Sequence, residues 1–216
     1  MRSSIIAAFL ILTLSACQPA TTPDSTADSS SFSSIPAMAS DSSSDTASSL
    51  GVTLLSGKHT VTLKTSKGNI TLELDADMAP KTVTNFVEHA KEKYYDGLTF
   101  HRVIPGFMIQ GGDPSGNGTG GESIFGETFE DEIDPSNSVY SGGYKTGAIA
   151  MANRGPDTNG SQFFIMEKDY PLPPNYTIFG RVTKGQDVVT KIANTERNPS
   201  NDMPTQKVTF SVEMVK

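Results

Sequence analysis

The sequence of 216 residues contains one cysteine, no tryptophan and three histidines. A single cysteine cannot form an internal disulfide, and it cannot supply the paired cysteines of structural zinc sites or of thioredoxin-like redox motifs. Basic residues are also scarce, because 17 Lys and Arg stand against 24 Asp and Glu, which gives a formal net charge of −7. Nucleic-acid binding needs basic patches that displace phosphate counterions. We therefore expect no nucleic-acid partner.

An apolar run near the start of the chain predicts export. Residues 5–14 are too few to cross a bilayer as a helix, but their length is typical of a signal-peptide core. They end in Leu14-Ser15-Ala16-Cys17, which resembles the lipobox of bacterial lipoproteins. The resemblance implies a signal peptide over residues 1–16 and acyl chains, palmitate among them, on Cys17. We expect a protein anchored by lipid to a bacterial membrane, on its periplasmic or extracellular face; the choice between inner and outer membrane stays open.

A change of composition after Cys17 predicts a tether followed by one folded domain. Serine and threonine dominate residues 18–49, and no lysine or arginine follows Arg2 until Lys58. So few large apolar side chains cannot offset the entropy of an ordered chain. We expect a flexible tether over residues 17–57 and a folded domain over residues 58–216.

Within the folded part, the hydrophobic pattern predicts mainly strands. Alternation over residues 61–65 and 70–74, on either side of the turn residues 66–69, predicts a hairpin. Apolar residues at helical spacing after Pro80 predict one helix, and residues 186–193 predict a second. Further short strands are expected at residues 99–103, 107–110, 147–151, 162–166, 177–182 and 208–214. Many short strands with few helices favour a closed barrel or a sandwich, with the first and last strands as neighbours.

Several familiar chemistries lack the sequence context that they need. Residues 116–121 match the dinucleotide pattern G-x-G-x-x-G, but no strand leads into them and no helix follows, so we expect a glycine-rich turn. The histidines have no metal-ligand spacing, and Ser161 lacks the G-x-S-x-G context of hydrolases. The acidic residues 127–134 lack the spacing of a calcium loop, so we expect a solvated loop there. We expect no metal and no cofactor.

What remains is a set of segments that mix one arginine, amides and apolar side chains. They read FHRVIPGFMIQGGD over residues 100–113, GTGG over 118–121, FEDE over 129–132, MAN over 151–153, NGSQFF over 159–164 and FG over 179–180. In this order they resemble the cyclophilins, the cyclosporin-binding peptidyl-prolyl cis/trans isomerases, and the resemblance covers the whole folded part. It implies an eight-stranded closed antiparallel β-barrel with a helix at each end, and a groove on its outer face that binds proline-containing polypeptides.

The resemblance also implies the site residues. Arg102 corresponds to the catalytic arginine. The implied substrate-binding residues are Ile104, Phe107, Met108, Gln110, Gly118, Ala152, Asn153, Gln162, Phe164, Leu172 and Tyr176. His101 is expected to be held by hydrogen bonds of its loop and to take no part in catalysis. No long apolar stripe calls for a partner subunit, so we expect a monomer that assists the folding of exported proteins.

The chain departs from the pattern of many relatives at three places, two of them within residues 170–176 and one at Arg154. Pro171 or Tyr170 replaces a tryptophan that donates a hydrogen bond to cyclosporin, so we expect weak cyclosporin binding. Tyr176 takes the place of a histidine, and Arg154 stands where a small residue is common, which we expect to narrow or charge the groove. Two alternatives remain: a proline-peptide binding module without useful catalysis, and a surface interaction protein whose anchor matters more than its domain.

Overall fold

The structure is a computed structural model that describes residues 51–215. The expected signal peptide, the lipidation site Cys17 and most of the expected tether lie outside these residues. The described elements are β1 (Lys58–Thr65), β2 (Gly68–Asp75), α2 (Pro80–Lys91), β3 (Leu98–Thr99), β4 (Arg102–Ile104), β5 (Met108–Gly111), the 3-10 turn η1 (Ser138–Tyr140), β6 (Ala148–Met151), β7 (Phe163–Met166), β8 (Ile178–Lys184), α3 (Gln186–Ala193) and β9 (Thr209–Met214). No helix within residues 51–215 combines the length and the apolar character that a membrane crossing requires.

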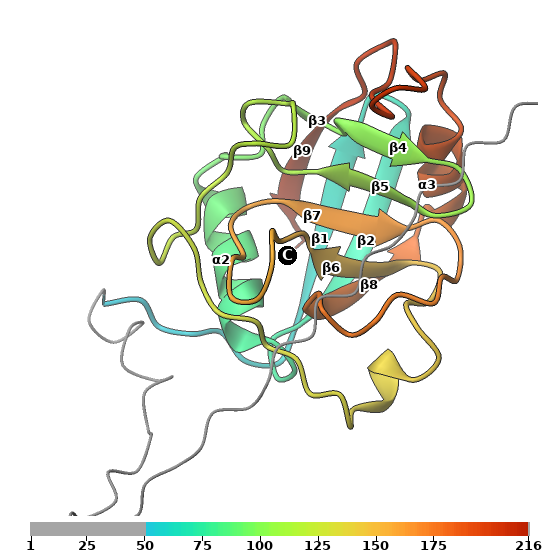
Figure 1. Ribbon diagram of the computed structural model, residues 1–216. Helices are drawn as coiled ribbons and strands as arrows, with labels where there is room; N and C mark the ends of the chain where they lie inside the picture. Colours follow the sequence, from blue (N-terminus) through green and yellow to red (C-terminus); the bar gives the residue numbers. More distant parts are fainter. Residues whose placement is uncertain (1–50, 216) are drawn as a thin grey trace, which may run out of the picture. The chain divides into compact units, whose positions relative to one another are not determined.

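All nine strands belong to one curled antiparallel sheet (Figure 1). Its order is β3-β9-β1-β2-β8-β6-β7-β5-β4, so the first long strand pairs with the last one, as the sequence predicts. The expected closed barrel of eight strands is wrong, because the sheet has nine strands and two edge strands, β3 and β4, that do not pair with each other. The reason lies in the strand expected over residues 99–103. It is interrupted at Phe100 and His101, and its two halves join opposite edges of the sheet.

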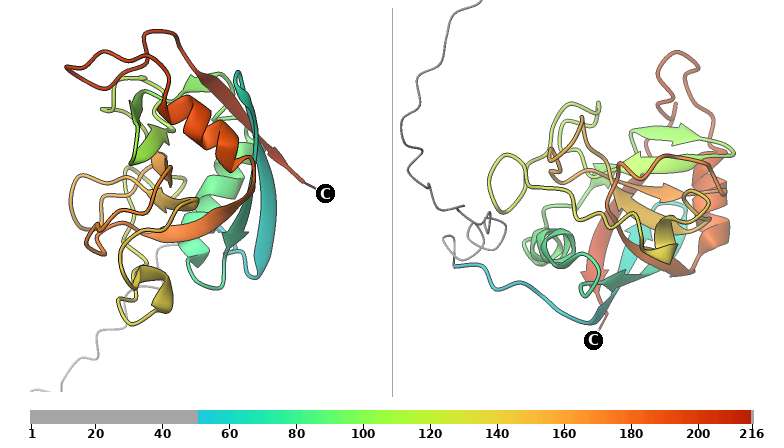
Figure 2. Two further views of the ribbon diagram at one scale, coloured as in Figure 1. Left: turned by 90° about the vertical axis from the view of Figure 1, so that its right-hand side faces the viewer. Right: turned by 60° about the horizontal axis from the view of Figure 1, so that its bottom comes forward.

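The two helices lie at opposite ends of the curled sheet, as Figures 1 and 2 show. Pro80 occupies the first turn of α2, where a missing backbone N–H costs nothing. The apolar face of α2 is fully buried in the core, and α3 buries Val189 and Ile192. Helix α2 begins at Pro80, as the sequence predicts, and α3 has the bounds that its apolar spacing predicts.

The N-terminus of α2 is satisfied by a residue from the acidic segment. Glu132 accepts hydrogen bonds from the backbone N–H groups of Lys81 at 2.9 Å and Thr82 at 2.8 Å. These donors have no partner inside the helix, and a carboxylate also complements the helix dipole. Burial raises the pKa of Glu132, while the hydrogen bonds from Thr82 and Lys81 act against that rise. The expected solvated loop is therefore wrong at Glu132, which docks on α2.

The middle strands of the sheet are buried on both faces. In β7, Phe163 and Ile165 point into the main core, while Phe164 and Met166 belong to a second apolar cluster on the opposite face. This division follows from the period of two in a strand. The second cluster carries the groove described below.

Some residues that precede β1 also pack against the hydrophobic core of the domain. Val52, Leu54 and Leu55 pack against the main core, and the Leu55 N–H donates a hydrogen bond of 2.9 Å to Thr84 Oγ1.

Candidate functional site

An apolar pocket of about 150 Å³ lies on the outer face of β5 and β7. Nine residues line it: Arg102, Phe107, Met108, Gln110, Ala152, Asn153, Phe164, Leu172 and Tyr176. The register of the sheet brings the strand residues together, since Gln110 pairs with both Arg102 and Phe164. All nine are among the residues that the sequence predicts. Ile104 is the exception on β4: it packs against the second apolar cluster and does not line the pocket.

Aromatic contacts shape the apolar wall. The ring of Phe164 meets Tyr176 edge to face at a centroid distance of 5.5 Å, and Tyr144 lies 6.1 Å from Phe164 on the buried side. Tyr144 Oη also donates to the Tyr176 carbonyl at 2.7 Å and accepts from the Tyr176 N–H at 3.0 Å. Phe107 packs against Tyr170 at 4.5 Å. The wall is thus a supported surface with room for a small apolar ring.

The polar rim of the pocket is a chain of side-chain hydrogen bonds. Arg102 Nη1 donates to Gln110 Oε1 at 3.4 Å, and Gln110 Nε2 donates to Gln162 Oε1 at 3.0 Å. Gln162 Nε2 then donates to the carbonyls of Gly120 at 2.7 Å and Gly118 at 3.2 Å. The Arg102 side chain remains 42% exposed, so its guanidinium can reach a bound molecule.

Gly112 permits the close approach that this chain needs. Its φ is +88°, and a Cβ there would lie 2.4 Å from the carbonyl oxygen of Ser161. Only glycine combines this conformation with such contact. The end of β5 can therefore lie against the segment that carries Gln162.

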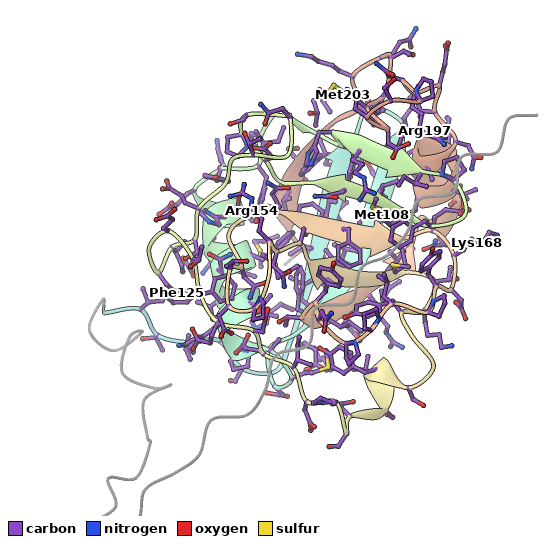
Figure 3. The ribbon with its side chains drawn as sticks, viewed as in Figure 1. Met108, Phe125, Arg154, Lys168, Arg197 and Met203 are labelled. Atoms are coloured by element: carbon purple, nitrogen blue, oxygen red, sulfur yellow. The ribbon has the colours of Figure 1, made fainter. Side chains whose placement is uncertain are left out.

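A second hollow of about 340 Å³ continues the groove past Gln110, Ala152 and Asn153. Gly118 and Gln162 line this hollow and not the apolar pocket, so the predicted substrate-binding residues are divided between two neighbouring sites. The guanidinium of Arg154 donates to the Thr119 carbonyl across it. In Figure 3, Met108 and Arg154 mark the two parts of the groove.

Asp113 organises the glycine-rich wall of the second hollow. Its carboxylate accepts hydrogen bonds from the N–H groups of Ser115 at 2.8 Å, Asn117 at 3.0 Å, Gly118 at 2.6 Å and Gly120 at 3.1 Å. Burial works to raise the pKa of Asp113, but the backbone hydrogen bonds outweigh burial and lower it. The segment 116–121 is therefore the glycine-rich turn that its sequence context predicts, and the structure shows that it wraps around the carboxylate of Asp113.

The side-chain amide of Asn153 is engaged away from the pocket. Its Nδ2 donates to the Asn175 carbonyl at 2.8 Å and to Asp131 Oδ1 at 3.3 Å. These bonds fix the segment after β6, in which Asn153 lines the apolar pocket.

His101 is buried, and within residues 51–215 neither of its ring nitrogens has a hydrogen-bond partner. The expectation that loop hydrogen bonds hold it is therefore wrong. Burial lowers the pKa of His101; the neighbouring Asp113 raises it, and Arg102 lowers it. His101 does not line the apolar pocket, and its burial disfavours the charged imidazolium.

The structure adds three supporting residues. Asp113 ends the motif over residues 100–113, whereas local sequence patterns do not reveal Tyr144 and Asp202. Asp202 Oδ2 lies 3.9 Å from Arg102 Nε. No cluster of three or more His, Cys, Asp or Glu side chains within residues 51–215 is placed to hold a metal ion.

Comparisons with known proteins show the family to which this chain belongs. A family model described as "Cyclophilin type peptidyl-prolyl cis-trans isomerase/CLD" matches residues 60–213. A putative peptidyl-prolyl cis-trans isomerase of Staphylococcus saprophyticus is 43% identical over 184 residues, covering 71% of this chain and 90% of that protein. Peptidyl-prolyl cis-trans isomerase-like 1 of Rhizopus delemar is 47% identical over 163 residues, covering 74% and 96%.

Solved structures show the same fold. The crystal structure of a cyclophilin type peptidyl-prolyl cis-trans isomerase of Cryptosporidium parvum has a TM-score of 0.69 and 34% identity, covering 74% of this chain and 99% of that one. That protein was also solved in the presence of the dipeptide Ala-Pro, with a TM-score of 0.68 and 35% identity, covering 73% and 99%.

Proposed function

Because this chain belongs to the cyclophilin-type peptidyl-prolyl cis-trans isomerases, we propose that it rotates X-Pro bonds at the apolar pocket and that Arg102 is its catalytic residue. The chain is a peptidyl-prolyl cis-trans isomerase by family and by its relatives. The observation that carries the proposed mechanism is a guanidinium at the rim of an apolar pocket, tied to Gln110.

The reaction breaks amide resonance and forms no covalent bond. The barrier is about 18–20 kcal/mol, and uncatalysed exchange takes roughly tens to hundreds of seconds. As the bond twists, the prolyl nitrogen becomes pyramidal and gains a lone pair that can accept a hydrogen bond. A planar amide nitrogen offers almost none. A donor at this nitrogen therefore binds the transition state more strongly than the ground state.

Arg102 suits this task because its charge is permanent and needs no proton transfer. Its Nη1 contacts Gln110, which leaves other guanidinium N–H groups for the substrate. Met108 and Phe164, 2% and 6% exposed, form an apolar floor that holds the proline ring while the preceding carbonyl turns. The Asn153 backbone and Gln110 bind the flanking peptide. One side of the rotating bond is anchored and the other is free.

The test is an isomerisation assay with a short X-Pro peptide on the purified protein. Arg102→Ala should lower kcat/KM by about a hundredfold to a thousandfold, as the loss of a transition-state donor does in other enzymes. Arg181→Ala is the matched control, since Arg181 is an exposed arginine on β8 outside both parts of the groove. A fully active Arg102→Ala variant would refute the arginine mechanism. A wild type that binds proline peptides without speeding exchange would make the groove a recognition module.

We also propose weak cyclosporin binding. The chain has no tryptophan, and Tyr170, 43% exposed, packs on Phe107 near the pocket. Titration of the protein with cyclosporin tests this, and a sub-micromolar Kd would contradict it.

For location and substrates, we propose a monomer anchored to a bacterial membrane through lipid on Cys17 that acts on exported polypeptides. The support is the apolar run, the small residues before Cys17 and the Ser/Thr-rich segment after it. Cells fed a tagged palmitate should label the wild type and not Cys17→Ser, and the variant should leave the membrane fraction. Equal labelling of both would contradict the anchor.

A further inference from the structure

The loop between α3 and β9 folds over the edge strand that carries Arg102. The Val103 N–H donates a hydrogen bond of 2.9 Å to the Asp202 carbonyl, so the loop continues the pairing of β4 beyond the sheet. Figure 3 shows Arg197 and Met203 of this loop beside β4. Asp202 therefore keeps its place relative to the strand of Arg102.

The conformation of Asp202 is fixed by its own contacts. Its φ is +58°, a left-handed conformation that is rare outside glycine and tolerated by Asp and Asn. Its N–H donates to the Asn198 carbonyl at 2.8 Å, and its Oδ1 accepts from Arg197 Nε at 3.0 Å. A side chain held in this way presents its second oxygen in a defined direction.

That second oxygen faces Arg102. Asp202 Oδ2 lies 3.9 Å from Arg102 Nε, while Gln110 Oε1 lies 3.4 Å from Arg102 Nη1. We propose that Asp202 is a positioning residue for Arg102. A long arginine side chain that is 42% exposed has many rotamers, and ordering them at each turnover costs free energy. A carboxylate within ion-pair range of one edge of the guanidinium, and a hydrogen-bond acceptor at another edge, reduce that cost before substrate arrives.

Arg197 is part of the arrangement because it keeps the cluster cationic. One carboxylate lies between two guanidinium groups, so the trio retains a net positive charge. Asp202 can orient Arg102 without cancelling the field that stabilises the prolyl lone pair. This inference rests on the proposed catalytic role of Arg102.

The test is a double-mutant cycle. Asp202→Asn keeps a residue that tolerates the left-handed conformation and removes only the negative charge. It should lower kcat about fivefold, the upper range for a partly exposed ion pair, and leave KM unchanged. In an Arg102→Ala background the same substitution should have no effect, because the group that it positions is gone. The slow exchange of the double variant is measured by NMR exchange spectroscopy on an X-Pro peptide.

Two further variants sharpen the result. Asp202→Gly, also compatible with the backbone, should reproduce the loss of Asp202→Asn. Asp157→Asn is the matched control, since Asp157 has a φ of +59° and lies outside the apolar pocket; its kcat should equal the wild-type value. An unchanged kcat in Asp202→Asn would overturn the proposal, and so would an equal loss in both backgrounds, which would mean that the loop acts independently of Arg102. A fully active Arg102→Ala variant would instead refute the arginine mechanism itself.

Discussion

Tyr144 supports the pocket through a single hydroxyl group. Its ring is 1% exposed, and its Oη bonds both the carbonyl and the N–H of Tyr176. Burial raises the pKa of this hydroxyl well above its ordinary value of 10.0, so it stays a donor at physiological pH. Tyr144→Phe keeps the ring and leaves two backbone groups of Tyr176 without this partner. We expect the free energy of unfolding to fall by about 1–3 kcal/mol and KM for an X-Pro peptide to rise.

Denaturant unfolding and steady-state kinetics measure the two effects. Tyr140→Phe is the control, because the Tyr140 hydroxyl accepts one bond of 3.1 Å from the Ile178 N–H, whereas the backbone groups of Tyr176 bond to the Tyr144 hydroxyl. It should lose some stability and keep its KM. If both variants raise KM equally, the hydroxyl of Tyr144 has no specific role at the pocket.

Among single residues, the sequence predicts the site residues that stand in a shared motif. It does not predict the residues that contact them from distant parts of the chain. Met108 and Phe164 stand in short segments whose joint pattern identifies them. Asp202 and Tyr144 reach the site from distant loops, and no local spacing links either to Arg102 or Tyr176. The sequence also does not predict that the buried imidazole of His101 lacks hydrogen-bond partners, because hydrogen bonding depends on the groups that pack around a residue in the fold.

At the scale of elements, the loop 113–121 depends on one carboxylate. Asp113 is fully buried and accepts four backbone N–H groups, among them those of Gly118 and Gly120, whose carbonyls in turn hold Gln162. Asp113→Ala should lower the free energy of unfolding by about 2–4 kcal/mol, because hydrogen bonds to a buried charge are strong. It should also raise KM, since Gln162 loses its fixed acceptors.

Thermal or urea unfolding and peptide kinetics check this. Asp134→Ala is the control, because Asp134 makes similar turn bonds to Ser136 in an exposed position. Its effect on stability should stay within about 0.5 kcal/mol. A loss in Asp113→Ala no larger than in the control would show that the loop holds its shape without the carboxylate.

The sequence predicts the elements that have strong hydrophobic periodicity, but it does not predict that the sheet stays open between its two edge strands. The hairpin and both helices obey local rules of alternation, turn chemistry and a first-turn proline. The interruption at Phe100 and His101 arises because the Phe100 N–H pairs with Val208 and the Val103 N–H with Asp202, two distant partners. The local alternation over residues 99–103 does not predict these two distant hydrogen-bond partners, and therefore does not predict the interruption of the strand.

At the scale of the whole molecule, two buried histidines link stability to pH. His89 and His101 are 4% and 5% exposed, and burial lowers the pKa of both below the ordinary value of 6.5. As pH falls below 6.5, the unfolded chain binds protons at both rings, while the folded chain binds them only at a lower pH. The free energy of unfolding should therefore fall, by up to about 1.4 kcal/mol per pH unit for each histidine.

Other groups act in different ranges or with the opposite sign. The lowered pKa of Asp113 adds stability that is lost only as pH falls below its ordinary value of 3.8. The raised pKa of Glu132 favours the folded state as pH falls toward 4.5, which partly offsets the histidines. Urea unfolding between pH 8 and 5 should therefore be compared for wild type, His89→Gln, His101→Gln and the double variant. Each single substitution should flatten the fall in stability below pH 6.5, and the double variant should flatten it further. Equal slopes in all four proteins would mean that both imidazoles gain protons in the folded state as readily as in the unfolded chain.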